Sequence, residues 1–475
     1  MKSPHPIRWP DRMIEAGALV LLICTPLAYG TVEPWTEAIV ELMLLGMVLV
    51  WVLGMLWDRE ARIELPPGWL PACLFLAMVF LQTAPLPGAL VSLVSQWVFS
   101  LHQAAAAHVG GPSHLVPLSL APHATLREAL KLAAVATFFL LCYNTYQTRS
   151  QVIRAVWTMA VMGALISLFG IVQRVTWTGR LYWIGPEAGG STFSLGPFVN
   201  RAHFAGLVII VLPMAVALLL VGRRDHVFRT APRHWMDRLR RSAARTPGPT
   251  RLVPFLIMLM GGTVLVSGSR GGLVALTVSL LIMAALAGGA WHARRVTLML
   301  GLIALTGAWI GGDVLYGTVN RLLEEMGRPE GPAGRLRLWA DALRLFRDAP
   351  IVGTGYASFD VAFPEWRTVP AALTFTHAES DWIELLTDTG LMGIGLALAV
   401  TGCMGFALLR RARVTPNSSA RILAVGAAGA LISVVVHGLG NFTLPVMSNL
   451  LYLAVALGVG LSGADDASRP AAVPR

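Results

Sequence analysis

Long, continuous apolar runs are the feature that most constrains how this chain can fold. The stretch "HFAGLVIIVLPMAVALLLV" at 203–221 is one of them, and similar runs recur along the sequence. A helix needs roughly 20 apolar residues to span a hydrocarbon core of about 30 Å. Within lipid every backbone polar group needs an internal partner, so only helices or closed barrels can span a bilayer. Runs of this length exclude a barrel and predict an all-α polytopic membrane protein.

Composition supports this class, because 55% of the residues are hydrophobic and only 13% are charged, whereas soluble domains contain about 25% charged residues. Apolar windows bounded by charge or by Pro and Gly predict about twelve transmembrane helices. The expected spans are 13–30, 36–57, 67–86, 127–145, 151–172, 203–221, 252–268, 272–291, 296–312, 384–409, 420–438 and 446–463.

The basic residues indicate the orientation of these spans. The net charge is +11, and most arginines lie beside one set of span ends, which the positive-inside rule assigns to the cytoplasm. Both termini are then cytoplasmic, and the opposite side faces the periplasm. The predicted parts are N-terminal transmembrane helices (1–190), central helices (191–312) with a basic cytoplasmic loop (222–251), a periplasmic loop (313–383), C-terminal helices (384–463) and a disordered tail (464–475).

The large periplasmic loop contains a predicted amphipathic helix, "GRLRLWADALRLFRDAP" at 334–350. Leu336, Trp339, Leu343 and Phe346 follow one another at spacings of three and four, the period of one helical face. We therefore expect them to form its buried stripe. Pro350 and the glycines that follow it end the helix.

Arg270 lies in "VLVSGSRGGLVAL" at 264–276, between two apolar segments on the periplasmic side. Gly271 and Gly272 allow a turn between two helices there, and Ser269 can cap the second one. The positive N-terminus of that helix and the planar guanidinium would together make an anion site suited to phosphate. Taken alone, the arginine is explained equally well by snorkelling or by a lipid head-group contact.

A second segment repeats this arrangement. "FVNRAHFAGLVIIVLP" at 198–213 places Asn200, Arg201 and His203 at the periplasmic mouth of another span. The repetition favours a polyanionic ligand approached from the membrane, such as a lipid diphosphate.

The segment "THAESDWIELLTDTGLMGIGLAL" at 376–398 supplies a candidate base. Helical spacing puts His377, Asp381 and Glu384 near one face, with Glu379 turned away. Trp382 is expected at the membrane interface. A neutral imidazole here could take a proton from an acceptor hydroxyl, although a histidine beside a helix start can also be purely structural.

The short segment "VHGLGNF" places His437 at the periplasmic end of a later span. It could contribute sugar contacts, or it could form a structural loop.

Four stretches together resemble the O-antigen ligase and polymerase family of bacterial envelope glycosyltransferases. They are "FVNRAHFAG" at 198–206, "SGSRGGLVAL" at 267–276, "GRLRLWADALRLFRDAPIVGTGYASF" at 334–359 and "HAESDWIELLTDTGLMG" at 377–393. The resemblance covers roughly residues 190–410. Relatives often have Asn directly after the motif histidine or three residues after it, where Ala378 and Ser380 stand here, which puts any acceptor contact of that amide in doubt. Ala202 also stands where an Asn is common.

The resemblance implies a fold like that of the membrane-embedded GT-C glycosyltransferases, in the bacterial inner membrane. It implies an undecaprenyl-diphosphate-linked glycan as donor, and lipid A-core or another glycan as acceptor. It assigns the diphosphate to Arg201, Arg270 and either Arg335 or Arg337, and the acceptor-activating base to His377. No metal and no cofactor are implied, because the cationic side chains stabilise the leaving diphosphate.

The predicted reaction is therefore one inverting displacement at the anomeric carbon, with the arginines facing a cavity that they share with the histidine. An O-antigen or polysaccharide ligase is favoured, and a polysaccharide polymerase or a protein O-oligosaccharyltransferase of the same family is the alternative. A flippase of lipid-linked glycans would also be polytopic, but its charges are expected near the membrane midplane. A structural scaffold would need no ordered base and anion cluster.

Overall fold

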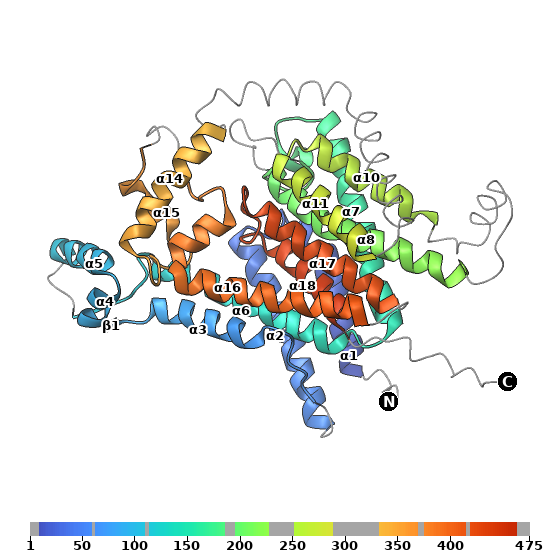
Figure 1. The fold of residues 1–475 in the computed structure, drawn as a ribbon, viewed down its shortest axis with the longest axis horizontal. Helices are drawn as coiled ribbons and strands as arrows, with labels where there is room; N and C mark the ends of the chain where they lie inside the picture. The colour runs from blue at the N-terminus through green and yellow to red at the C-terminus, as the bar shows by residue number, and fades with distance from the viewer. Residues whose placement is uncertain are drawn as a thin grey trace.

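The computed structural model describes residues 9–58, 62–109, 114–185, 195–227, 251–287, 332–368, 375–414 and 419–462. Most of this part of the chain is helical (Figure 1). The α-helices are α1 (Trp9–Leu27), α2 (Pro34–Trp57), α3 (Trp69–Thr83), α4 (Gly88–Val94), α5 (Gln96–Val109), α6 (Pro122–Thr145), α7 (Arg149–Val175), α8 (Arg201–Val227), α10 (Val253–Val266), α11 (Arg270–Ala287), α14 (Pro332–Asp348), α15 (Phe359–Ala362), α16 (Asp381–Val414), α17 (Ser419–His437) and α18 (Met447–Leu461).

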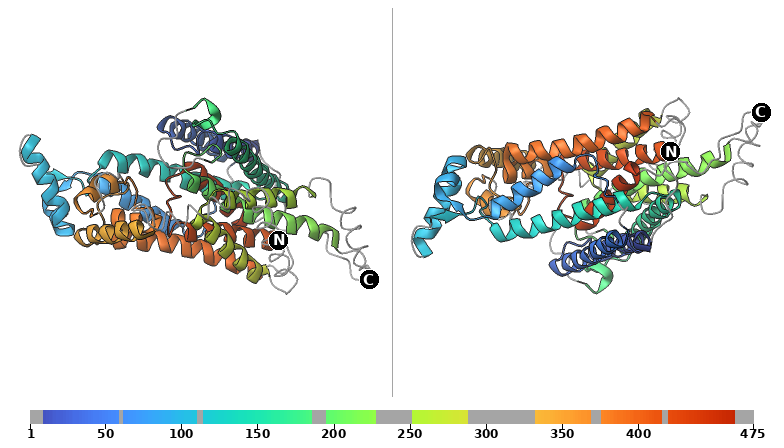
Figure 2. Two further views of the ribbon diagram at one scale, coloured as in Figure 1. Left: turned by 90° about the horizontal axis from the view of Figure 1, so that it is seen from above. Right: turned by 90° about the horizontal axis from the view of Figure 1, so that it is seen from below.

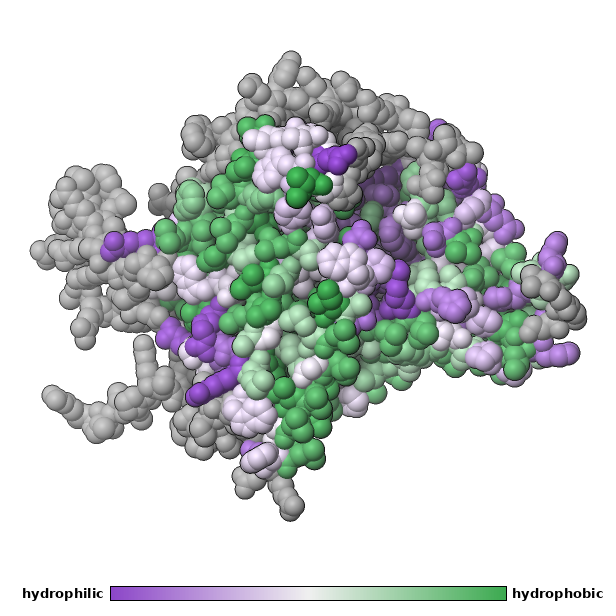
Figure 3. Space-filling view, turned by 180° about the vertical axis from the view of Figure 1, so that it is seen from behind, coloured by the Kyte–Doolittle hydropathy of each residue, from purple (hydrophilic) through white to green (hydrophobic). Residues whose placement is uncertain are grey.

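A helix occupies each predicted span except 296–312, which lies outside the described residues, as does most of the predicted loop 222–251. Five described helices are long and apolar enough to cross a membrane, and four further apolar helices are shorter. The all-α membrane class therefore agrees with the structure, whereas about twelve spans are not reached among the described residues. Much of the central part of the face in Figure 3 is hydrophobic, with hydrophilic side chains gathered to either side of it.

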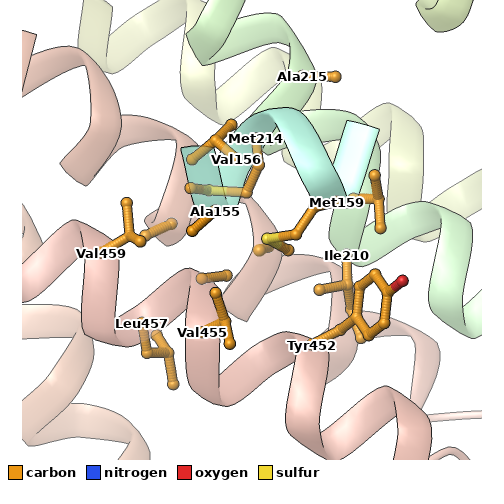
Figure 4. Close-up of a cluster of buried hydrophobic side chains, with 14 of the residues drawn as sticks. Ala155, Val156, Met159, Ile210, Met214, Ala215, Tyr452, Val455, Leu457 and Val459 are labelled. Carbon is orange, nitrogen blue, oxygen red and sulfur yellow. The ribbon is translucent and has the colours of Figure 1, made fainter. Parts of the chain in front are cut away.

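Helix α8 is the centre of the bundle. It packs against α7, α10, α11, α17 and α18, and 94% of its apolar window is buried, against 22% for α2. Figure 4 shows where Met159 of α7, Ile210 and Met214 of α8, and Tyr452 of α18 meet. Burial of this kind holds the N-terminal end of α8 in a fixed position, which matters for the site.

One end of the bundle carries a separate layer made of α4, α5, α14 and α15, which we call the end layer (Figures 1 and 2). It also contains a two-stranded antiparallel ribbon, β1 (Leu86–Pro87) with β2 (Leu115–Val116), in which Leu86 pairs with Val116. A short 3₁₀ helix, η3 (Phe363–Glu365), directly follows α15 in this layer, and a second one, η1 (Leu181–Trp183), follows α7.

Helix α14 forms where it is predicted, but its buried stripe differs from the expected one. Leu336 and Leu343 are 63% and 42% exposed. The buried side chains are instead Leu338, Ala342 and Leu345, which pack against α15, η3 and the segment before α16. The sequence contains two apolar stripes at helical spacing, and the one that includes a small alanine allows the closer approach.

Helix α16 is interrupted at Gly390, whose φ of +63° lies outside the helical region. The segment 350–355 fills the interruption. Leu391 N donates to Pro350 O (2.9 Å), and Gly355 N donates to Asp388 O (3.0 Å). An added Cβ at Gly390 would lie 2.4 Å from the carbonyl carbon of Ile351, so glycine is required there.

Candidate active site

A cavity of about 320 Å³ lies between the bundle and the end layer. Its lining comes from α2 and α6, from residues 376–377 and α16, and from residues 442–446. His377 and His203 both line it. We call the segment 437–446, which connects α17 to α18, the central loop.

His377 is held by a carboxylate. Its Nδ1 lies 2.8 Å from Glu384 Oε1, and Glu384 Oε2 accepts from Ala378 N (2.9 Å). Because Nδ1 is engaged in this way, Nε2 is the nitrogen positioned to exchange a proton with a substrate. Burial lowers the pKa of His377, but the hydrogen bond and charge of Glu384, with Glu379 and Asp381, outweigh it, and the pKa lies above its ordinary value. The arrangement has the geometry of a general base with an orienting carboxylate.

The sequence suggested that helical spacing brings His377 and Glu384 together, but the contact arises in a different way. Helix α16 begins only at Asp381, and His377 lies in the irregular segment before it. Glu379 has a φ of +55°, so the chain turns there and brings the imidazole back over the first turn of the helix. Trp339 of α14 fixes this turn by donating its Nε1–H to Ala378 O (2.9 Å).

Asp381 anchors the central loop. Its carboxylate accepts from Thr443 N (3.0 Å) and Leu444 N (3.2 Å), and its own N–H donates to Asn441 O (3.0 Å). These bonds place Phe442 between two imidazoles. The Phe442 ring stacks on His377, with centroids 4.4 Å apart, and meets His203 edge to face at 4.9 Å.

His437 and Trp382 have structural contacts in this fold. His437 is fully buried, and its Nδ1 lies 2.6 Å from Thr443 Oγ1. It does not line the cavity, so of the two roles that the sequence left open the structural loop agrees better with its position. Trp382 Nε1 donates to Val435 O (3.0 Å) and joins α16 to α17.

Ser269 caps α11 as predicted, because its Oγ accepts from Gly272 N (3.2 Å). The turn before the helix, however, is made at Gly268, which has a φ of +64°. Gly271 and Gly272 lie within α11 and permit close packing instead. An added Cβ at Gly271 would lie 2.1 Å from Asn441 Nδ2, so the start of α11, and with it Arg270, is pressed against the central loop.

Arg201 begins α8 in a similar way. Asn200 Oδ1 accepts from Ala202 N (2.8 Å), which occupies that side chain with capping rather than with a ligand. Gly206, one turn further on, packs against Thr443. The N-terminal ends of α8 and α11 therefore both meet the central loop.

Arg335 of α14 reaches the same loop. Its Nη1 donates to Gly440 O, and its Nη2 donates to Glu379 Oε2, both at 3.0 Å. Burial raises the pKa of Glu379, and the charge of Arg335 partly offsets this. Arg335 thus joins three segments in this state. Arg337 lies two residues further along α14 and is exposed.

The predicted arginines do not line the cavity beside His377. Arg335 and the starts of α8 and α11 contact the central loop, and a cavity shared by these arginines and His377 stays a prediction. The basic side chains that line the cavity are Arg127 and Lys131.

Lys131 is a functional candidate that the sequence reasoning missed. It is one of only two lysines in the chain and lies inside the predicted span 127–145. A charged side chain within a membrane span is energetically costly and needs partners. This isolated lysine within an apolar span was the sequence signal that could have identified it. Its Nζ lies 2.9 Å from Glu37 Oε1 and 2.7 Å from Glu128 Oε2.

Among the described residues, no group of three or more His, Cys, Asp or Glu side chains is arranged to hold a metal ion. In the comparisons with known proteins, residues 255–398 match a family model described as O-antigen ligase. The match confirms the family resemblance of the sequence. It includes Arg270, Arg335, His377 and Glu384. No curated protein matches the chain.

Proposed function

Because residues 255–398 carry an O-antigen ligase domain, we propose that this protein is a membrane glycosyltransferase that moves a glycan from undecaprenyl diphosphate to an acceptor hydroxyl. The observation that carries the proposal is the hydrogen bond between His377 and Glu384 at the wall of a cavity large enough for a sugar. Both residues lie within the matched range.

In the proposed reaction the acceptor hydroxyl enters the cavity and gives its proton to His377 Nε2. The acceptor oxygen then attacks the anomeric carbon of the donor, and the bond between that carbon and the diphosphate oxygen breaks. The diphosphate leaves with the electron pair, so a single displacement inverts the anomeric centre. Glu384, hydrogen-bonded to Nδ1, stabilises the imidazolium that forms.

Negative charge grows on the diphosphate as it leaves, so cations aimed at it accelerate the step. We assign the diphosphate to Arg201 and Arg270, which begin α8 and α11, because each adds a guanidinium to the positive end of a helix. Arg335 can contribute only if its partner Glu379 moves aside. In this scheme the arginines supply the positive charge at the leaving group.

The acceptor that we propose is lipid A-core, which makes the protein a ligase in lipopolysaccharide assembly. The site would face the periplasm from the inner membrane, with both termini in the cytoplasm. The apolar helices support a place in the membrane, and the clusters of arginine support this orientation.

The test is a reconstituted transfer assay with the full chain in lipid nanodiscs, an undecaprenyl-diphosphate-linked glycan and lipid A-core. We expect glycosylated lipid A-core with inverted linkage and release of undecaprenyl diphosphate, both lost in His377→Gln. A flippase would move the donor across vesicles without forming a glycosidic bond, and that result would overturn the proposal.

A deletion strain separates ligase from polymerase. A ligase defect leaves finished polymer on its carrier lipid, whereas a polymerase defect leaves single repeat units attached to the core. Accumulation of single units would reassign the protein to the polymerases of the family.

A further inference from the structure

The cavity beside His377 is rich in acid. Six carboxyl groups line it against two basic side chains, and these acids are Glu37, Glu128, Asp360, Asp381, Glu384 and Asp388. Both cations already face acids of the same wall. Lys131 Nζ lies between Glu37 and Glu128, and Arg127 Nη2 lies 3.5 Å from Glu128 Oε1. The cavity therefore offers a poor environment for a diphosphate.

Asp388 has one carboxyl oxygen whose hydrogen-bonding capacity is not used by the described residues. The residue is 2% exposed, and its Oδ2 accepts from Ala357 N (2.7 Å). Its Oδ1 is buried and has no hydrogen-bond partner among the described residues, and Asp388 lines the cavity. Buried polar atoms in folded proteins nearly always have partners, so a hydroxyl or an ammonium in the cavity would complete this one.

Aromatic rings provide the apolar part of the lining. Phe442, Phe359 and Tyr356 all border the cavity, and Phe442 is held flat against His377. Ligand sites typically combine apolar surface with a few placed polar groups. The aromatic rings can contact the carbon faces of a sugar, and the carboxylates can accept hydrogen bonds from its hydroxyls. The lining therefore suits a carbohydrate.

We propose that this cavity is the acceptor subsite and that its acids select a neutral or amine-bearing sugar over a phosphorylated one, with Asp388 and Asp360 as the specificity-determining residues. The inference rests on the proposed glycosyl transfer. Asp360 is exposed and Asp388 is buried. The first therefore repels anions at the entrance, and the second binds the acceptor directly. Like charges brought together without compensation disfavour the wrong partner.

The experiment compares three acceptor probes with one polyprenyl-diphosphate-linked glycan as donor. The probes are an alkyl glucoside, the matching alkyl glucosaminide and an alkyl glucoside that carries a phosphate monoester. For the wild type we expect kcat/KM to be at least about tenfold lower for the phosphorylated probe than for the other two. The reason is that repulsion between the phosphate and the acids weakens binding, and each tenfold change in affinity corresponds to only a small loss of binding free energy.

Asp360→Asn should raise the relative use of the phosphorylated probe by about threefold to tenfold, an effect that high salt weakens because the group is exposed. Asp388→Asn keeps the acceptor oxygen for Ala357 N and should raise the KM of the glucosaminide by about tenfold. Neither change should alter the KM of the donor. The matched control is Glu365→Gln, an exposed acid of the neighbouring η3 that does not line the cavity, and it should leave the preference unchanged.

The inference is overturned, with the proposed function intact, if the wild type uses all three probes equally or if the two aspartate variants raise the donor KM instead. If the wild type transfers to none of them, nor to lipid A-core, the proposed function fails as well. Equilibrium binding of the glucosaminide needs no donor, so weaker binding to Asp388→Asn than to the wild type supports the subsite, and equal binding contradicts it.

Discussion

The two sides of the central loop differ in charge. Its Phe442 to Val446 part borders a cavity lined by acids, whereas the arginines that begin α8 and α11, Arg201 and Arg270, are not among the described residues that line this cavity. The difference matches the two needs of a glycosyl transfer. A histidine base gains basicity from neighbouring carboxylates, and a leaving diphosphate needs cations. Placing both in one undivided pocket would let each neutralise the other.

The strongest test of this division is His377→Gln. We expect kcat to fall by about 10² to 10⁴-fold, the range for loss of a general base, while the KM of the donor changes little because the arginines are untouched. Initial rates of transfer in nanodiscs, at saturating acceptor, measure both. If the variant retained more than half of the activity, His377 would not be the general base, and the cavity lined by acids would have no catalytic base assigned to it.

Arg270→Gln tests the other side of the loop. Loss of one contact to the developing charge should reduce kcat/KM for the donor by about 10²-fold, with the KM of the acceptor unchanged. Arg347→Gln serves as the matched control, because Arg347 is exposed near the end of α14. Equal effects of the two substitutions would show that charge in general, rather than this position, matters.

Glu384→Gln sharpens the comparison through pH. The base must be neutral, so activity should rise with pH through a pKa that lies above the ordinary histidine value of 6.5. Removing the carboxylate removes the influence that raises this pKa, and the acidic limb of the kcat profile should move to lower pH. The maximal rate should fall by about tenfold because the ring loses its orientation. A limb that stays in place would show that another group titrates.

Arg335→Gln and Arg337→Gln give the smallest expected effects and decide which arginine of α14 matters. Arg335 joins Glu379 to Gly440, so its loss should loosen the turn before α16 and reduce kcat/KM by about threefold to tenfold. Arg337 is exposed, and its loss should change the rate by less than about twofold. The reverse order would move the diphosphate contact to Arg337.

Sequence reasoning located most of the helices because an apolar run of fixed length has few other solutions in lipid. It located the cap at Ser269 for a similarly local reason, since hydroxyl caps depend on a few adjacent residues. It failed for α14, where two stripes were possible and only the partners at Phe359 and Phe363 decide between them.

The site was harder to predict because its walls come from distant parts of the chain. Glu37 and Lys131 line the same cavity as His377, and no local pattern connects α2 and α6 to a segment more than 200 residues later. Glu384 was placed near His377 for the wrong reason, since the contact depends on the turn at Glu379 rather than on one helical face.

The interruption of α16 at Gly390 has a mechanical consequence. The backbone groups that the interruption leaves without helical partners form hydrogen bonds with Pro350 to Gly355. Helix α16 therefore depends on the segment that connects α14 to α15 for part of its backbone hydrogen bonding. Moving that segment away would leave these peptide groups without hydrogen-bond partners beside the bilayer, and each such group costs several kcal/mol of free energy. The contact between residues 350–355 and α16 is therefore expected to be rigid. Substrates then have to reach His377 without a rotation of the end layer about this contact.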